Sequence, residues 1–199
     1  MIFEQVANGG CQSYLIGCGD ACVGALIDPE VRKIDRYRAL AAQHGVRIQY
    51  IIDTHTHADH FSASKQLSEI LGMPVVAHRN SPAPYIDLRV DEGDVIKVGN
   101  IRLTVLHTPG HTRDAICLVG SDRVFTGDTL LIGATAAPTS LAAIPSNSTT
   151  RCSTNCLSWT RDCASIQRTS TRAVPAPPSR KSCAPTPACR SAIAASSSR

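Results

Sequence analysis

Short apolar runs separated by turn residues fill the first 133 residues of the chain. Val, Ile and Leu gather in brief stretches that end at pairs such as Gly9-Gly10 and Asp28-Pro29, which is typical of β-strands. Apolar positions recur at helical spacing from Ile34 to about Gly45, and again from about residue 62 to residue 71. The pattern therefore predicts two helices there, and strands at residues 2–6, 13–16, 23–27, 48–52, 75–77, 95–98, 101–106, 115–119 and 123–125.

This alternation of many strands with two interspersed helices predicts a domain built in layers. A sheet has two faces, and an apolar face is stable only when another sheet or a layer of helices covers it. The fold class expected for residues 1–133 is therefore α/β.

The pattern stops at Gly133. From residue 134 to residue 199 the apolar positions follow neither a two-residue nor a 3.6-residue period, and five prolines between residues 175 and 187 would interrupt any helix. The charge changes at the same point, because residues 1–133 carry 12 Lys and Arg against 15 Asp and Glu, and residues 134–199 carry 8 against 1. We expect a folded region, 1–133, and an aberrant, disordered tail, 134–199, whose basic charge marks no specific nucleic-acid partner.

The sequence gives no sign of a membrane segment or an export signal. No apolar run approaches the roughly 20 residues that span a bilayer, and the first ten residues lack a basic start followed by an apolar stretch. We expect a cytoplasmic protein with no membrane partner, and the sequence leaves its oligomeric state open.

Four potential metal ligands lie within six residues, directly after the apolar run at residues 48–52. They are His55, His57, Asp59 and His60. The end of a buried strand is rigid, and a loop that follows it lets several side chains converge. Imidazole and carboxylate groups together suit a divalent transition metal. A single His is usually structural, but this cluster predicts a metal site.

Two further candidate ligands also follow predicted strands. His111 lies in the segment Thr-Pro-Gly-His-Thr after the strand at 101–106, and Asp128 lies in Thr-Gly-Asp-Thr after the strand at 123–125. The glycines of both segments allow tight turns that aim a side chain from the end of a strand. His78 and His107 also lie near strand ends, and we interpret them as structural or pocket-lining residues and not as ligands. Arg113-Asp114 is expected to be an exposed turn.

The segments THTHADH, TPGHT and TGDTLL, in this order and at these separations, resemble the metallo-β-lactamase superfamily. The segments Ser-Tyr-Leu-Ile at 13–16 and Ala-Leu-Ile-Asp-Pro at 25–29 are similar to the opening strands of its glyoxalase-II-like branch. The resemblance implies an αββα sandwich with the metal at one edge of the two sheets. It covers residues 1–133, so the C-terminal part of the sandwich is expected to be incomplete.

Within this branch the resemblance leaves two chemistries open. Persulfide dioxygenases hold one Fe(II) with the equivalents of His55, His111 and Asp128, and oxidise a small-molecule thiol substrate, glutathione persulfide, to sulfite. A set of two His and one carboxylate leaves open positions on the iron. The resemblance to these enzymes is the one we favour.

The alternative is a hydroxyacylglutathione hydrolase of the glyoxalase II type with a dinuclear zinc site. There the equivalents of His55, His57 and His111 hold one metal, Asp59 and His60 help to hold the other, and Asp128 bridges them. In either chemistry Asp59 and His60 are the candidate catalytic residues. In the dioxygenase, His57, Asp59 and His60 would orient ligands and water.

The tail lacks two segments with which the family continues, a Gly-Arg-Thr-Asp stretch and a later Pro-Ala-His stretch. Both emerge when the tail is back-translated with permitted codons and read in another frame. Residues 165–172 then give Tyr-Pro-Ala-His-Glu-Tyr-Lys-Gly, and residues 134–140 give Asp-Gly-Arg-Thr-Asp-Phe. We therefore predict that the tail is frameshifted. The recovered Gly-Arg-Thr-Asp favours the dioxygenase, and a second alternative is that the chain as written is an inactive, truncated fragment.

Overall fold

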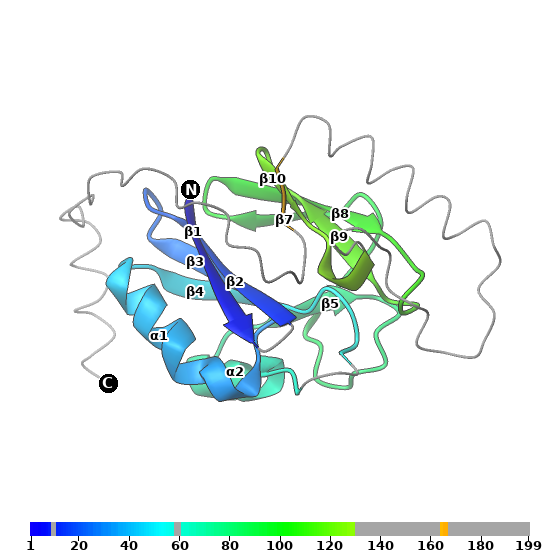
Figure 1. The fold of residues 1–199 in the computed structure, drawn as a ribbon, viewed down its shortest axis with the longest axis horizontal. Coiled ribbons are helices and arrows are strands. Elements are labelled where there is room, and N and C mark those ends of the chain that lie inside the picture. Colours follow the sequence, from blue (N-terminus) through cyan, green and yellow to red (C-terminus); the bar gives the residue numbers. More distant parts are fainter. Residues whose placement is uncertain (9–10, 58–60, 130–163, 167–199) are drawn as a thin grey trace.

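Two β-sheets and two helices make up the part of the chain that the computed structural model describes, residues 1–8, 11–57, 61–129 and 164–166 (Figure 1). The strands are β1 (Ile2–Asn8), β2 (Cys11–Cys18), β3 (Val23–Ile27), β4 (Arg47–Ile52), β5 (Val75–His78), β6 (Leu88–Val90), β7 (Val95–Val98), β8 (Ile101–His107), β9 (Ile116–Val119), β10 (Arg123–Phe125) and β11 (Ala164–Ile166). The helices are α1 (Ile34–Gln43) and α2 (Ser64–Leu71), with short 3-10 turns η1 (Val31–Lys33) and η2 (Gly127–Thr129). None of these helices has the length and apolar character needed to cross a bilayer.

The first sheet has the strand order β1-β2-β3-β4-β5-β6. Strands β1, β2 and β3 pair antiparallel, and from β3 to β6 every pairing is parallel. Parallel neighbours need a crossover connection, which α1 supplies between β3 and β4 and α2 supplies between β4 and β5. Both helices cover the outer face of this sheet (Figure 1).

The second sheet has the order β11-β10-β9-β8-β7. Its strands β7 to β10 pair antiparallel, and β11 pairs parallel with β10. Strand β11 lies within the region expected to be an aberrant tail, and the other residues of that region lie outside the described ranges. The sequence pattern also missed β6, whose three residues are exposed or half-buried and form no apolar run.

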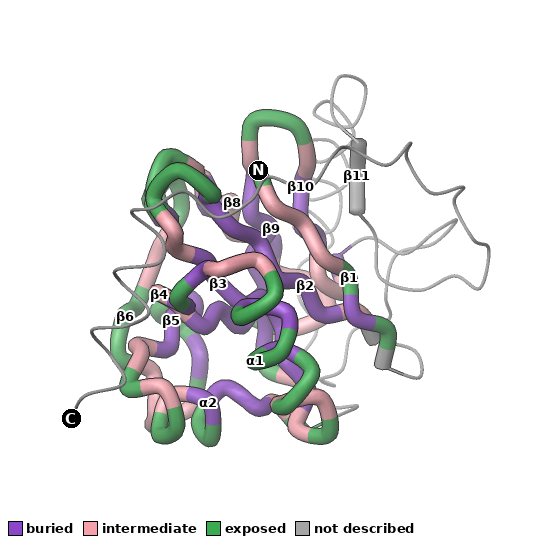
Figure 2. The backbone as a smooth tube through the Cα atoms, turned by 90° about the vertical axis from the view of Figure 1, so that its left-hand side faces the viewer, coloured by how far each residue is buried: buried purple, intermediate pink, exposed green. Residues whose placement is uncertain are grey.

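The core follows the two-residue alternation of the strands. In β2, Tyr14 and Ile16 face the second sheet, while Leu15 between them faces the helices. The ring of Phe125 from β10 packs edge-on against Tyr14, with 5.3 Å between ring centroids. Figure 2 shows this burial along the strands of both sheets. The first sheet is therefore buried on both faces, as its apolar runs predicted.

The predicted strands and helices correspond to observed elements, with shifts of up to two residues at most ends. The largest shift at a helix start is at α2, which begins at Ser64 and not at residue 62. Backbone bonds from Val31 N–H to the Phe61 carbonyl and from Ala63 N–H to the Pro29 carbonyl hold residues 61–63 in a connection to the end of β3. The helix can begin only after this connection.

Candidate metal centre

Three predicted ligands from both sheets meet at one edge of the fold. His55 follows β4 of the first sheet, whereas His111 and Asp128 follow β8 and β10 of the second sheet. Their ligand atoms all lie within 4.8 Å of one another. Segments far apart in the sequence thus place two imidazoles and one carboxylate around a common point.

The distances in this cluster suit a shared cation. Nε2 of His111 lies 3.5 Å, and Nε2 of His55 lies 3.8 Å, from Oδ2 of Asp128. Both distances exceed the usual 2.7–3.2 Å of an N–H···O hydrogen bond. Two atoms that each bind an ion at about 2.1 Å are at most about 4.2 Å apart, so the observed spacing is compatible with ligands of one ion.

Hydrogen bonds fix which nitrogen of His55 faces this point. The hydroxyl of Thr54 donates to Oδ2 of Asp28 at 2.8 Å, so its single proton is committed. The same oxygen lies 2.9 Å from Nδ1 of His55, which must therefore carry the proton and donate. This leaves Nε2 of His55 with a lone pair, and among the described residues this buried atom has no hydrogen-bond partner. A metal ion is the partner that such an atom fits.

Burial keeps His55 in the form that binds metal. Burial, followed by the neighbouring His57, lowers the pKa of His55 to about 4. The ring is therefore neutral near pH 7, and a neutral imidazole is required for metal ligation.

His57 lies beside His55, with 4.2 Å between ring centroids, but a carboxylate of the fold holds one of its nitrogens. Nε2 of His57 donates to Oδ1 of Asp28 at 3.2 Å, and that oxygen also accepts the backbone N–H of Thr54 at 2.7 Å. Asp28, His55 and His57 form a second group whose ligand atoms lie within 4.8 Å. Both oxygens of Asp28 already accept hydrogen bonds, so Asp28 is better suited to orient the histidines than to bind an ion.

The charge of Asp28 is maintained despite its burial. Burial alone would raise the pKa of this carboxyl, but the charge and hydrogen bond of His57, with further contributions from His55 and the Thr54 backbone, lower the pKa to about 2. Asp28 has a φ of 49°, in the left-handed region that Asp and Asn tolerate better than most residues. The sharp turn at the end of β3 directs this carboxylate toward the segment after β4 that carries His55 and His57, here called the metal loop.

A second buried carboxylate, Asp53, ties the metal loop to α2. Its Oδ1 accepts hydrogen bonds from Ser64 at 2.6 Å and Ser62 at 3.1 Å, and it lies 3.9 Å from Nε2 of His57. Burial raises the pKa of Asp53 to about 6, with His57 and the serines acting in the opposite direction. Asp53 therefore joins the start of α2 to the end of β4.

The loop that carries His111 is bonded to the loop that carries His55. Thr56 donates to Oδ2 of Asp114 at 2.7 Å, and the backbone N–H of Ile116 donates to the Thr54 carbonyl at 2.8 Å. The expectation of an exposed turn at Arg113-Asp114 is thus wrong for Asp114, which is 3% exposed. Its carboxylate is buried because it links the two sheets.

The other predicted site residues divide as follows. Asp59 and His60 lie outside the described residues. Sequence reasoning missed Asp28, Asp53, Thr54 and Asp114, although Asp28 and Asp53 each directly follow an apolar strand of the first sheet. Neighbouring parallel strands end at one edge, so this position was the available signal.

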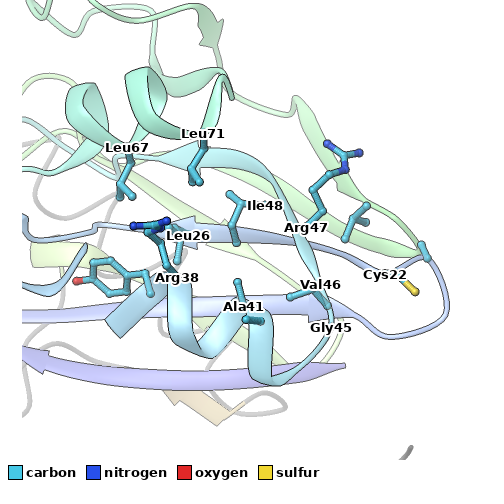
Figure 3. Close-up of a pocket in the computed structure, with 14 residues that line it drawn as sticks. Cys22, Leu26, Arg38, Ala41, Gly45, Val46, Arg47, Ile48, Leu67 and Leu71 are labelled. Carbon is cyan, nitrogen blue, oxygen red and sulfur yellow. The ribbon is translucent and has the colours of Figure 1, made fainter. Parts of the chain in front are cut away.

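A separate cavity lies between α1 and α2, over the outer face of β3 and β4 (Figure 3). It has a volume of about 520 Å³ and an apolar lining that includes Leu26, Ile48, Leu67 and Leu71. None of its lining residues belongs to the metal cluster. The cavity is therefore separate from the metal cluster, which lies at the edge of the sheets.

Comparison with known proteins relates the chain to enzymes of two activities. It is 37% identical over 123 residues to the human mitochondrial persulfide dioxygenase ETHE1, covering 60% of this chain and 48% of that protein. It is 41% identical over 122 residues to a hydroxyacylglutathione hydrolase of Rhodopseudomonas palustris (strain BisB18), covering 59% and 47%. The chain thus spans about half the length of these relatives.

The fold and the family agree with these similarities. The crystal structure of ETHE1 from Myxococcus xanthus superposes with a TM-score of 0.64 at 40% identity, covering 66% of this chain and 59% of that chain. The family model described as the metallo-beta-lactamase superfamily matches residues 7–157. The expected αββα fold and its glyoxalase-II-like branch are thereby confirmed, with the C-terminal part incomplete in the described residues. The chain belongs to the metallo-beta-lactamase superfamily, whose fold binds metal ions.

Proposed function

We propose that this protein is an Fe(II)-dependent dioxygenase that acts on glutathione persulfide. The observation that carries the proposal is the cluster of His55, His111 and Asp128, two imidazoles and one carboxylate with their ligand atoms within 4.8 Å. This donor set is the one that non-haem Fe(II) oxygenases use. Similarity to persulfide dioxygenases supports the same substrate class.

The reaction balances with dioxygen and water as co-substrates. Glutathione persulfide, O₂ and H₂O give glutathione, sulfite and two protons, so the outer sulfur is oxidised and dioxygen is reduced. Bound iron supplies the oxygen chemistry. The protein holds it through Nε2 of His55, through His111 and through Asp128, and the bonds from Thr54 and Asp28 keep the lone pair of His55 facing the metal.

Asp59 and His60 complete the proposal as the candidate catalytic residues. In the sequence they follow His57, between the residues of β4 and those of α2. We assign them, with His57, the task of orienting ligands and water in this one-metal site.

Iron content and oxygen uptake test the proposal. The chain is loaded with Fe(II) without oxygen, desalted, and supplied with glutathione persulfide in an oxygen electrode. We expect one iron per chain and sulfite production, both lost in His111→Ala and kept in His44→Ala. His44 is a matched control because its ring bonds Glu4 at 2.7 Å, away from the cluster. Two zinc ions per chain with thioester hydrolysis and no oxygen uptake would refute the dioxygenase.

The second candidate function is a zinc-dependent hydroxyacylglutathione hydrolase. It is supported by the similarity to such a hydrolase and by the place of His57 beside His55, with 4.2 Å between ring centroids. In this case His57, Asp59 and His60 would act as ligands, so His57→Ala would lower the zinc content by one ion per chain. In the one-iron site the same substitution leaves the metal count unchanged.

We further propose that residues 134–199 are translated from a shifted reading frame and that residues 1–133 carry the family's fold. The proposal is supported by the family segments recovered in the other frame. An independent read of the gene across the codons for Leu131 to Ala137 tests it. If the read shows that a nucleotide was miscounted there, the proposal holds. If it reproduces the printed sequence, the second alternative applies, and the chain is an inactive fragment that takes up neither iron nor oxygen.

A further inference from the structure

We infer that His107 is a positioning residue, which fixes the loop that carries His111 by a hydrogen bond to the Arg113 carbonyl and by a ring stack on His78. The inference rests on the proposed metal centre, because it concerns how one of its ligands is held. It assigns a role to two histidines that the sequence pattern suggested were merely structural or pocket-lining.

His107 is the last residue of β8 and bonds across the loop that follows this strand. Its Nε2 lies 3.0 Å from the carbonyl oxygen of Arg113, two residues beyond His111. A carbonyl only accepts, so Nε2 of His107 carries the proton and donates. The side chain of His107 therefore bonds the end of the loop at Arg113, while its backbone begins the loop at the end of β8.

The ring of His107 is itself held by His78. The two rings stack with 3.9 Å between centroids and 12° between their planes. His78 ends β5 of the first sheet and is 1% exposed, so it is a fixed surface for a ring from the second sheet. The stack thus fixes the His111 loop relative to the first sheet, which also carries His55.

Hydrogen bonds also fix the protonation of His78. The backbone N–H of Asn80 donates to Nδ1 of His78 at 3.2 Å, so the ring proton is on Nε2, which lies 3.5 Å from Oδ1 of Asp91. Both rings therefore present a protonated Nε2. A pair arranged in this way does not offer two lone pairs to a cation, which argues for positioning and against a second metal site.

Charged neighbours surround the stack on each element that packs against it. Arg79 pairs with Oδ2 of Asp91, the side chain of Glu92 accepts the backbone N–H of His107, and Asp114 accepts from Thr56. Each carboxylate near the rings thus already has a donor. The Arg113 carbonyl is therefore the acceptor that Nε2 of His107 bonds.

Three substitutions at position 107 separate the bond from the ring. His107→Phe keeps an aromatic ring for the stack and removes the donor. His107→Gln keeps an N–H donor in place of Nε2, and His107→Met has a similar length without a donor. His44→Phe is the matched control, since it removes a histidine with one side-chain bond at a site away from the cluster.

The measurement is the affinity of the full chain for Co(II), a spectroscopic substitute for Fe(II), with the d–d absorption band as a report on ligand geometry. Loss of a residue that orients a ligand typically weakens metal binding 10- to 100-fold. We expect about that loss, with an altered band, in His107→Phe and His107→Met. His107→Gln, which keeps the donor but loses the stack, should weaken binding less than His107→Met, and His44→Phe should bind within about threefold of the wild-type chain. Thermal unfolding without metal serves as the control for folding.

The outcomes separate this inference from the proposed function. If the wild-type chain binds no Co(II), the proposed metal centre fails, and the inference fails with it. If the wild-type chain binds but Gln and Met at position 107 weaken binding equally, or neither weakens it, the positioning role alone is overturned. The Gln–Met comparison decides the matter even if His107→Phe does not fold.

Discussion

Replacing Asp28 by Asn tests whether the Asp28–Thr54–His55 chain of hydrogen bonds sets the metal-binding nitrogen. Asn is the right perturbation, because it keeps the shape of Asp and tolerates the φ of 49° at this position. It removes the charge and turns one acceptor into a donor. Ala would add backbone strain and would leave three donor groups without an acceptor.

The consequence can be followed atom by atom. If the Asn oxygen still accepts from Thr54 N–H and His57, its amide NH₂ faces the Thr54 hydroxyl where Oδ2 of Asp28 was an acceptor. The hydroxyl must then turn and donate to Nδ1 of His55, which moves the ring proton to Nε2. The lone pair no longer faces His111 and Asp128.

Two magnitudes follow from this rearrangement. Loss of an orienting residue weakens metal affinity about 10- to 100-fold, or about 1.4–2.8 kcal/mol. Loss of a buried hydrogen bond to a charged group costs about 1.5–3 kcal/mol of unfolding free energy in the metal-free chain. The pKa of Asp28 is about 2 in the fold and 3.8 in the unfolded chain, so this stability is present above about pH 4 and is lost as pH falls toward 2.

The assay is Co(II) or Zn(II) titration of the full chain, with urea unfolding in chelator measured in parallel. Asp35→Asn is the matched control, because the Asp35 side chain is 98% exposed and its ion pair with Arg38, at 3.7 Å, is long and solvent-exposed. Asp35→Asn should change neither quantity measurably. Metal affinity in Asp28→Asn within threefold of wild type would refute the reasoning, since the lone pair of His55 would then not depend on Asp28.

Three further predictions use other parts of the site. Gly127→Ala should weaken metal binding far more than Gly72→Ala in the same titration. Both glycines have a positive φ, but a Cβ at Gly127 would overlap Oγ1 of Thr54, whereas Gly72 has open space around it. Equal effects would mean that backbone strain alone is responsible. Burial and His107 lower the pKa of His78 below 6.5, so on acidification the unfolded chain binds a proton there before the folded chain does. The unfolding free energy in chelator should therefore fall as pH drops from about 6.5. His78→Phe should make this dependence of the unfolding free energy on pH shallower, and an unchanged dependence would contradict the assignment. Addition of Zn(II) at about 100 times its dissociation constant should stabilise the chain by about 2.7 kcal/mol and raise its melting temperature, and His111→Ala should abolish the shift.

The arrangement of strands and helices was largely predictable because each leaves a period in the sequence. The alternation of Tyr14, Leu15 and Ile16 gives the two-sided first sheet, and Tyr37, Leu40 and Ala41 give the helix stripe that covers it. Strand β6 could not be predicted, since its three residues are exposed or half-buried and form no apolar run. Order within the sheets also depends on crossovers that no local pattern records.

The convergence of the candidate ligands could be predicted, whereas the roles of the residues that orient them could not. His55, His111 and Asp128 follow strands in segments that resemble known motifs, so their convergence was expected. Asp28 resembled an ordinary turn residue before proline, and Asp114 an exposed one. Their roles depend on which atoms face them across the fold, and only the three-dimensional structure brings Thr54 and Thr56 to these carboxylates.

The candidate centre depends on how the two sheets pack, because each sheet supplies part of it. His55 comes from the first sheet and His111 and Asp128 from the second, and the rings of Tyr14 and Phe125 fill the core between them. Asp128 lies three residues after Phe125, so a shift of β10 against β2 would move a ligand directly. Two contacts at the edge oppose such a shift, the bond from Thr56 to Asp114 and the stack of His78 on His107. Since packed cores resist sub-ångström displacement, the geometry of the candidate ligands is set by the packing of the sheets and by the contacts that hold their loops against it.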